Sequence, residues 1–221
     1  VRDGVPFRLT MSLTPPLCAM MRDPMLQDRY VHGLEKLLEL TGKELERTRH
    51  DPVFHELARF YNDRLHHCRH MFCDRYRRDL VGAFRKFQDA GFLEIITCGA
   101  THGFLPLMRE FPQAVRAQIQ VARNDYRNCF GRDPRGIWLP ECAYDPGVEK
   151  HLQEAEIRWF ILDAHGVLYS EPRPAYGVFA PIFTHAGPAA FGRDIESSKQ
   201  VWSAEEGYPG DGVGEDGGED S

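Results

Sequence analysis

The chain has 221 residues, of which 42% are hydrophobic, enough for one large domain with a buried core. Most of its net charge of −6 lies in the last ten residues, so the rest is nearly neutral. Without a basic stripe, the sequence argues against a nucleic-acid partner. No apolar run approaches the ~20 residues of a membrane span, so no membrane partner is expected either.

The six cysteines are scattered along the chain rather than paired in a compact framework. Such a distribution favours reduced thiols and a cytoplasmic protein over a disulfide scaffold. The chain begins at Val1 without an initiator methionine or a signal-peptide pattern, which is typical of a fragment or of a processed end.

The first half of the chain predicts a strand, two long helices and a second strand. The first strand covers Phe7–Leu13 and ends at Thr14. Leucines share one face of the first helix, and the second begins at Asp51-Pro52 as an N-cap and proline pair. The apolar stripe of this second helix predicts a buried face and comprises Phe54, Leu57, Ala58, Tyr61, Leu65, Cys68, Phe72, Tyr76 and Leu80. A strand over Leu93–Cys98 follows.

The next segment alternates between helices and strands. One helix places four apolar residues on one side, namely Val115, Ile119, Ala122 and Tyr126. A strand over Ile137–Leu139 follows, then a helix from Pro146 to about Ala155 with Asp145 as its expected N-cap, and a strand over Arg158–Leu162. Strands alternating with helices predict a parallel sheet with right-handed crossovers.

Polar residues follow each of the four expected strands: Thr14, Thr101-His102, Glu141 and Asp163-Ala164-His165. The carboxyl ends of parallel strands share one edge, which carries the chemistry in α/β barrels. Periodicity alone leaves an open sheet and a barrel as alternatives, but this pattern favours a barrel-type site. Glu141 lies just past a strand that Pro140 ends, near Trp138 and Tyr144, and suits a nucleophile facing a sugar ring. The alternative is a helix-capping or loop glutamate.

Residues 163–211 are rich in glycine, proline and aromatics and predict an irregular functional segment with a short strand over Phe179–Phe183. Residues 212–221 predict a disordered, acidic, low-complexity tail. Glu205 and Glu206 are expected to be solvated, with a fallback role as acid.

A second candidate site is His66-x-x-x-His70, because this spacing puts two imidazoles on one face of a helix and can hold a metal. Cys68 between them falls on the apolar stripe, and no pair of aspartates accompanies them. We therefore expect Cys68 to be buried and no metal to bind. No glycine-rich phosphate loop follows any strand, so no nucleotide cofactor is expected.

Two segments closely resemble signatures of glycoside hydrolase family 57: Ile96-Thr97-Cys98-Gly99-Ala100-Thr101-His102-Gly103-Phe104-Leu105-Pro106-Leu107 and Trp138-Leu139-Pro140-Glu141-Cys142-Ala143-Tyr144. The sequences of these two segments are most similar to those of the 1,4-α-glucan branching enzymes of that family. Three further segments resemble the same enzymes: Leu162–Gly166, Ala190–Asp194 and Val201–Asp211.

The resemblance implies an incomplete, truncated (β/α)7 barrel over residues 1–211 with a long helical insertion, and retaining chemistry on α-1,4-glucan such as glycogen, amylose or a maltooligosaccharide. Glu141 matches the nucleophile. His102, Trp138, Asp163, His165 and Trp202 are expected to line the substrate site.

The chain departs from the family pattern at both ends. No His-x-Pro strand precedes Phe7, and the family's general acid aspartate lies on a later strand. The resemblance therefore implies that this chain carries only one of the two catalytic carboxyls, Glu141, and has little activity alone. It also implies that the first strand, Phe7–Leu13, lacks its neighbour at the edge of the barrel. An amylase or 4-α-glucanotransferase of the same family, and a non-catalytic glucan-binding remnant, remain as alternatives.

Overall fold

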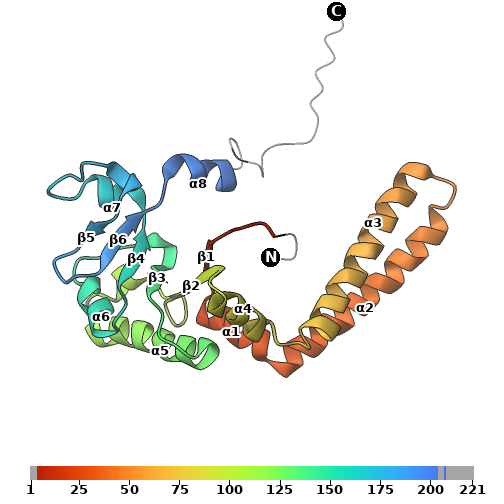
Figure 1. Ribbon diagram of the computed structural model, residues 1–221, viewed down its shortest axis with the longest axis horizontal. Coiled ribbons are helices and arrows are strands. Elements are labelled where there is room, and N and C mark those ends of the chain that lie inside the picture. Colours follow the sequence, from red (N-terminus) through yellow and green to blue (C-terminus); the bar gives the residue numbers. More distant parts are fainter. Residues whose placement is uncertain (1–3, 204–206, 208–221) are drawn as a thin grey trace, which may run out of the picture.

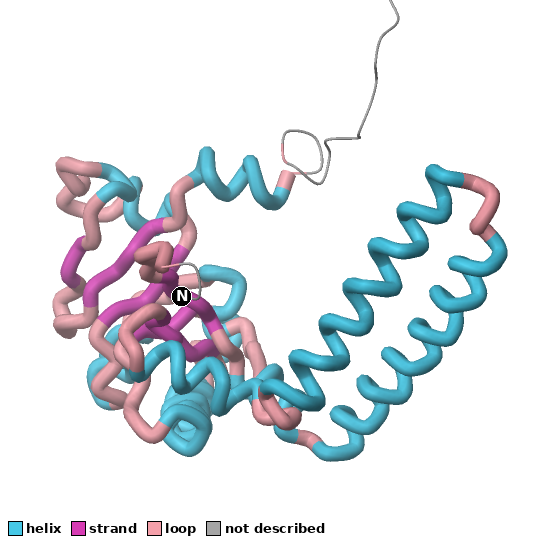
Figure 2. Tube along the Cα trace, turned by 45° about the vertical axis from the view of Figure 1, so that its right-hand side comes forward, coloured by secondary structure: helices cyan, strands magenta, loops and turns pink. Residues whose placement is uncertain are grey.

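The computed structural model describes residues 4–203 and Gly207. These residues form a sheet flanked by helices and, beside it, a long helical hairpin that projects away from the sheet (Figures 1 and 2). No helix among them has both the length and the apolar sequence of a membrane span. All six cysteines are free thiols.

The described residues form one six-stranded sheet in the order β1-β2-β3-β4-β6-β5. Its first five strands in this order are parallel, and β5 runs antiparallel to β6 at one edge. The strands are β1 Leu9–Ser12, β2 Leu93–Cys98, β3 Gly136–Trp138, β4 Trp159–Leu162, β5 Ile182–Phe183 and β6 Ala189–Gly192. The four parallel strands predicted from the sequence are confirmed, and of the fifth predicted strand, Phe179–Phe183, only Ile182–Phe183 forms a strand, β5. The strand β1 lies at the other edge, paired with β2 alone.

The helices of the described chain are α1 Pro15–Arg22, α2 Pro24–Arg47, α3 Pro52–Arg69, α4 Leu80–Asp89, α5 Pro112–Phe130, α6 Val148–Glu154, α7 Ala164–Leu168 and α8 Ile195–Trp202. One core cluster joins α5 and α6 to β3 and β4, and a second joins α1, α4 and α5 to β2. All four predicted apolar positions of α5 are buried. This packing fixes the strands whose ends carry the candidate site.

The second predicted helix is shorter than expected, and much of its apolar stripe is not buried. After α3 the chain continues as a π-helix, His70–Arg75, and then turns through Arg77 and Arg78, both at positive φ, before α4 begins. Because α3 packs mainly against α2, the far part of its stripe stays in solvent: Phe54 is 57% and Tyr61 51% exposed. Cys68 is only half-buried, so the prediction that it packs inside was wrong.

Two further expectations need correction. Gly147, at φ 107°, is the N-cap of α6, and Asp145 contributes only a backbone carbonyl, which accepts from Val148. Residues 163–202 are more regular than predicted, since they contain α7, β6 and α8. The strand β6 has the sequence Ala-Ala-Phe-Gly, whose small residues give no apolar signal; a Cβ at Gly192 would lie 2.8 Å from a methyl group of Val178.

Candidate functional site

The predicted residues follow three neighbouring strands, all at the same end of the sheet. His102 follows β2, Glu141 follows β3 and Asp163 follows β4. The register pairs Cys98 with Trp138, and Trp138 with Ile161, so the three strands end at the same level. This confirms that the polar residues after successive strands share one end of the sheet.

His102 and Glu141 are in direct contact although 39 positions separate them. The imidazole Nε2 of His102 lies 2.9 Å from Oε1 of Glu141. Both side chains remain accessible, with 43% of the His102 side chain and 70% of the Glu141 side chain exposed. A carboxylate that is oriented by a partner and still open to solvent can meet a ligand from outside the sheet.

The backbone around this contact is strained. His102, Glu141 and Cys142 have φ angles of 57°, 55° and 54°, in the left-handed region that non-glycine residues rarely adopt. Each such residue costs on the order of 1–3 kcal/mol and persists only where its surroundings hold it. Here the turn after β3 is fixed by the Cys142 amide, which donates to the Leu139 carbonyl at 2.7 Å. Strain of this kind clusters at functional sites.

A cysteine contacts the other nitrogen of the same imidazole. Sγ of Cys98, the last residue of β2, lies 3.3 Å from Nδ1 of His102. Cys98 is fully buried, and burial raises the pKa of its thiol to about 11, so the sulfur keeps its proton at neutral pH. No role was predicted for Cys98 from the sequence, although it lies within the segment that resembles a family signature.

Asp163 and His165 form a local pair beside the turn that carries Glu141. Oδ1 of Asp163 lies 2.8 Å from Nδ1 of His165, and this hydrogen bond lowers the pKa of the Asp163 carboxyl. The Asp163 amide donates to the carbonyl of Cys142 at 3.0 Å, which ties the end of β4 to the end of β3. Asp163 also caps α7, where its carboxylate accepts from the His165 amide.

Arg193 is a site residue that the sequence analysis missed. It follows β6, and its guanidinium carbon lies 5.7 Å from the centre of the Trp138 ring, a cation–π distance. Its Nη1 lies 3.9 Å from Sγ of Cys142, next to Glu141. Arg193 lies within Ala190–Asp194, one of the segments that resemble the family, but the strand that positions it was not predicted.

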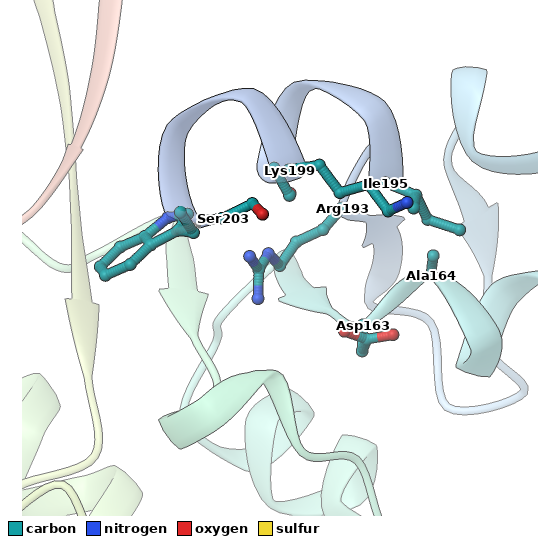
Figure 3. A pocket seen from close by; sticks show the side chains of 8 residues that line it. Asp163, Ala164, Arg193, Ile195, Lys199 and Ser203 are labelled. Atoms are coloured by element: carbon teal, nitrogen blue, oxygen red, sulfur yellow. The ribbon is translucent and has the colours of Figure 1, made fainter. Parts of the chain in front are cut away.

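The remaining predicted residue, Trp202, lines an open cavity of about 460 Å³ together with Asp163 and Arg193. Figure 3 shows Asp163 at the end of its strand, with Lys199 on the helix α8 above it and Ser203 directly after that helix. Trp202 is 78% exposed. The site therefore has two parts, the Glu141–His102 pair and the Asp163–Arg193–Trp202 cavity, which meet at Cys142.

The second candidate, His66-x-x-x-His70, lies where α3 passes into the π-helix, at the end of the hairpin that leads back to α4. Nδ1 of His70 lies 3.0 Å from a carboxylate oxygen of Asp74, and both side chains are exposed. That no metal binds here stays a prediction. Glu205, Glu206 and the acidic tail lie outside the described residues.

The site's motifs have counterparts in known proteins. A family model described as glycosyl hydrolase family 57 matches residues 10–201. The chain belongs to glycosyl hydrolase family 57.

Related sequences include proteins named as 1,4-alpha-glucan branching enzymes. A 1,4-alpha-glucan branching enzyme of Thermococcus kodakarensis is 32% identical over 96% of this chain and 34% of that protein. A probable 1,4-alpha-glucan branching enzyme of Mycobacterium tuberculosis is 32% identical over 63% of this chain and 25% of its own length. The chain thus spans about a third of the length of the first of these relatives.

Solved structures of family 57 members share the fold, a (β/α)7 barrel. The alpha-amylase AmyC of Thermotoga maritima is 44% identical, with a TM-score of 0.90, over 95% of this chain and 40% of that chain. A branching enzyme of Pyrococcus horikoshii is 32% identical, with a TM-score of 0.83, over 95% of this chain and 41% of that chain. The recognition of the family and of its fold is confirmed, whereas the specific activity is not decided by these relatives.

Proposed function

We propose that this chain supplies the nucleophile side of an α-1,4-glucan site, with Glu141 as the nucleophile and branching-enzyme chemistry as the activity of the complete catalytic unit. The observation that carries the proposal is the Glu141 carboxylate, which a strained turn and the His102 Nε2 contact at 2.9 Å hold at the ends of parallel strands. The resemblance of its motif and the named relatives supply the substrate class.

The proposed reaction proceeds with retention in two displacements. In the first, a Glu141 oxygen bonds to the anomeric carbon, and the α-1,4 bond breaks as an acid gives a proton to the leaving oxygen. In the second, a 6-hydroxyl of another glucan attacks the anomeric carbon, loses its proton to the same group, now a base, and releases Glu141. Water in place of the 6-hydroxyl gives hydrolysis, and a 4-hydroxyl gives disproportionation.

The acid of this mechanism requires a pKa that keeps its proton at neutral pH, and the two carboxyls of a retaining enzyme lie about 5 Å apart. Asp163 is tied to the Glu141 turn, but its hydrogen bond with His165 lowers its pKa, so it is ionised at neutral pH. It therefore suits binding of sugar hydroxyls rather than proton donation. We propose that the acid is not Asp163 and that this chain alone has little turnover.

The other predicted residues fit a sugar-binding surface. The rings of Trp138 and Trp202 offer apolar faces on which sugar rings stack, while Asp163, His165 and His102 offer hydrogen-bonding groups. The Arg193 guanidinium beside the Trp138 ring holds that ring in place.

The experiment is to incubate the purified chain with amylose and to measure two products and glucan binding separately. New α-1,6 linkages, detected as a change in chain profile after a debranching enzyme, indicate branching. New reducing ends without α-1,6 linkages indicate hydrolysis, the activity named for AmyC. Binding of maltooligosaccharide without any product fits both a missing acid and a non-catalytic site, and a glycosyl fluoride, whose leaving group needs no acid, then separates the two.

The control is a pair of variants. Glu141→Gln keeps the size of the side chain and is expected to abolish any product while leaving glucan binding within about threefold, because only the charge needed for bond formation is lost. Glu154→Gln, a surface glutamate that pairs with Arg116, is expected to behave as the wild type. Product formation by Glu141→Gln at the wild-type rate would remove Glu141 from the mechanism.

A further inference from the structure

Three side chains form a continuous line of contacts that begins inside the sheet and ends at the exposed carboxylate. Cys98 Sγ lies 3.3 Å from Nδ1 of His102, and His102 Nε2 lies 2.9 Å from Oε1 of Glu141. The cysteine is fully buried, whereas the side chains of the histidine and glutamate are 43% and 70% exposed. Both nitrogens of the imidazole therefore have a protein partner.

The direction of each hydrogen bond follows from the chemistry of the partners. An ionised carboxylate only accepts hydrogen bonds, so in this contact His102 Nε2 carries the hydrogen and donates a hydrogen bond to Glu141. At the other nitrogen, a buried thiol that keeps its proton can donate, and a neutral imidazole protonated on Nε2 has a free acceptor at Nδ1. The three groups fit together with His102 neutral and protonated on Nε2.

We infer that Cys98 is a positioning residue: its thiol donates to Nδ1 of His102 and holds the imidazole with Nε2–H directed at Oε1 of Glu141. As a contribution to catalysis this rests on the proposed function, but the hydrogen-bond arrangement itself does not. Because Oε1 is held, Oε2 is the oxygen left to bond to an anomeric carbon. A neutral His102 places no positive charge beside the Glu141 carboxylate.

Cys98 does not serve as a nucleophile in this arrangement. Nucleophilic cysteines are accessible thiolates, whereas Cys98 has no exposed surface and burial raises the pKa of its thiol to about 11. Its strand position also explains why it can hold the ring: Cys98 is paired with Trp138 of β3, in a strand that β1 pairs on the other side up to Ile96. The sulfur is thus fixed by the sheet, while His102 lies in a strained turn.

The test is a long-range 1H–15N spectrum of the imidazoles in the full chain, labelled with 15N-histidine, at neutral pH. The His102 signals are assigned by their loss in His102→Gln. We expect the wild type to show a protonated Nε2 and an unprotonated Nδ1. A wild-type His102 with its proton on Nδ1, or with both nitrogens protonated, would overturn the inference.

Variants then separate the contribution of the thiol from that of the carboxylate. Because Glu141 also favours the Nε2 proton, the comparison is made between Glu141→Ala and Glu141→Ala/Cys98→Ala. Adding Cys98→Ala is expected to lower the ratio of Nε2–H to Nδ1–H about threefold to tenfold, the size of one hydrogen bond. Cys98→Ser, which keeps a donor, restores the ratio, and Cys18→Ala, which removes a buried thiol elsewhere, leaves it unchanged.

Each outcome of the variants supports or contradicts a role for the Cys98 thiol. An unchanged ratio after Cys98→Ala, or the same change after Cys18→Ala, contradicts a role for the thiol. If Cys98→Ala does not fold, the wild-type spectrum and Cys98→Ser still test the inference. A Cys98→Ser chain with the wild-type ratio supports the donor role, and one that has lost the Nε2–H tautomer contradicts it. A correct tautomer in a chain that binds no glucan would refute the proposed function and leave the hydrogen-bond arrangement intact.

Discussion

The sheet region and the helical hairpin α2–α3 have equally regular apolar patterns, yet only the sheet region buries them. The apolar positions of α5 pack on β2 and share a core cluster with β3 and β4, and Ile119 and Ala122 have no exposed surface. On α3, by contrast, Phe54 and Tyr61 are more than half exposed, because within the described residues the hairpin packs chiefly on itself. Periodicity therefore identifies an apolar face, but a third packing layer decides whether that face is buried.

The largest expected difference between the two regions concerns a phenylalanine in each. Phe160, on β4, is fully buried, so Phe160→Ala should destabilise the chain by about 3–5 kcal/mol. Phe54 is 57% exposed, so Phe54→Ala should cost less than about 1 kcal/mol. Urea unfolding followed by circular dichroism measures both. Equal losses would show that the α3 stripe is covered in solution.

A smaller difference is expected for a polar group in each region. The Tyr126 hydroxyl is buried, 2.6 Å from Oε1 of Gln88 and 2.9 Å from the Ile95 carbonyl oxygen. Tyr126→Phe leaves these acceptors without their partner and should cost about 1–3 kcal/mol. Asn62→Ala removes the 2.9 Å bond from Asn62 Nδ2 to Thr41 between α2 and α3 and should cost about 1 kcal/mol or less. A larger loss for Asn62→Ala, in the same unfolding measurement, would reverse the ranking of the two regions.

Helix caps sharpen the comparison further, because the sequence pattern Asp-Pro precedes both α3 and α6. The Asp51 carboxylate accepts from the Phe54 amide at 3.2 Å, so Asp51→Ala should cost about 1 kcal/mol. Asp145 is not the cap of α6, and its side chain only approaches Arg109 at 3.9 Å. Asp145→Ala should therefore stay within about 0.5 kcal/mol, and a loss equal to that of Asp51→Ala would restore the cap predicted from the sequence.

The smallest effect is a dependence of stability on pH. Hydrogen bonds from Arg127 and then Arg123 lower the pKa of Asp133, which precedes β3. A carboxyl with a lowered native pKa stabilises the fold above its unfolded pKa of about 3.9, and this contribution disappears as the pH falls through the native pKa. The difference in unfolding free energy between wild type and Asp133→Asn should thus shrink from pH 7 to acid. A difference that grows in acid would give the opposite sign.

The sequence predicted the strands of the site and their shared edge because short apolar runs ended by Pro140 or by Gly99 are local signals. The residues His102, Glu141 and Asp163 were found in the same way, each directly after such a run. Arg193 was missed because three of the four residues of β6 are small, and such a strand shows no clear alternation of apolar and polar residues. The Cys98–His102 contact depends on a left-handed turn at His102, and no sequence pattern signals that turn.

The central claim is that Glu141 is a nucleophile toward an α-glucan, and trapping of a glycosyl ester tests it most directly. The probe is 5-fluoro-α-maltosyl fluoride, because fluoride leaves without help from an acid and the ring fluorine slows release of the ester. Mass spectrometry of the full chain should show one added glycosyl group, mapped to Glu141 and absent in Glu141→Gln, with Glu154→Gln labelled like the wild type. A label on another residue, or an unlabelled chain that still binds maltooligosaccharide, would contradict the claim.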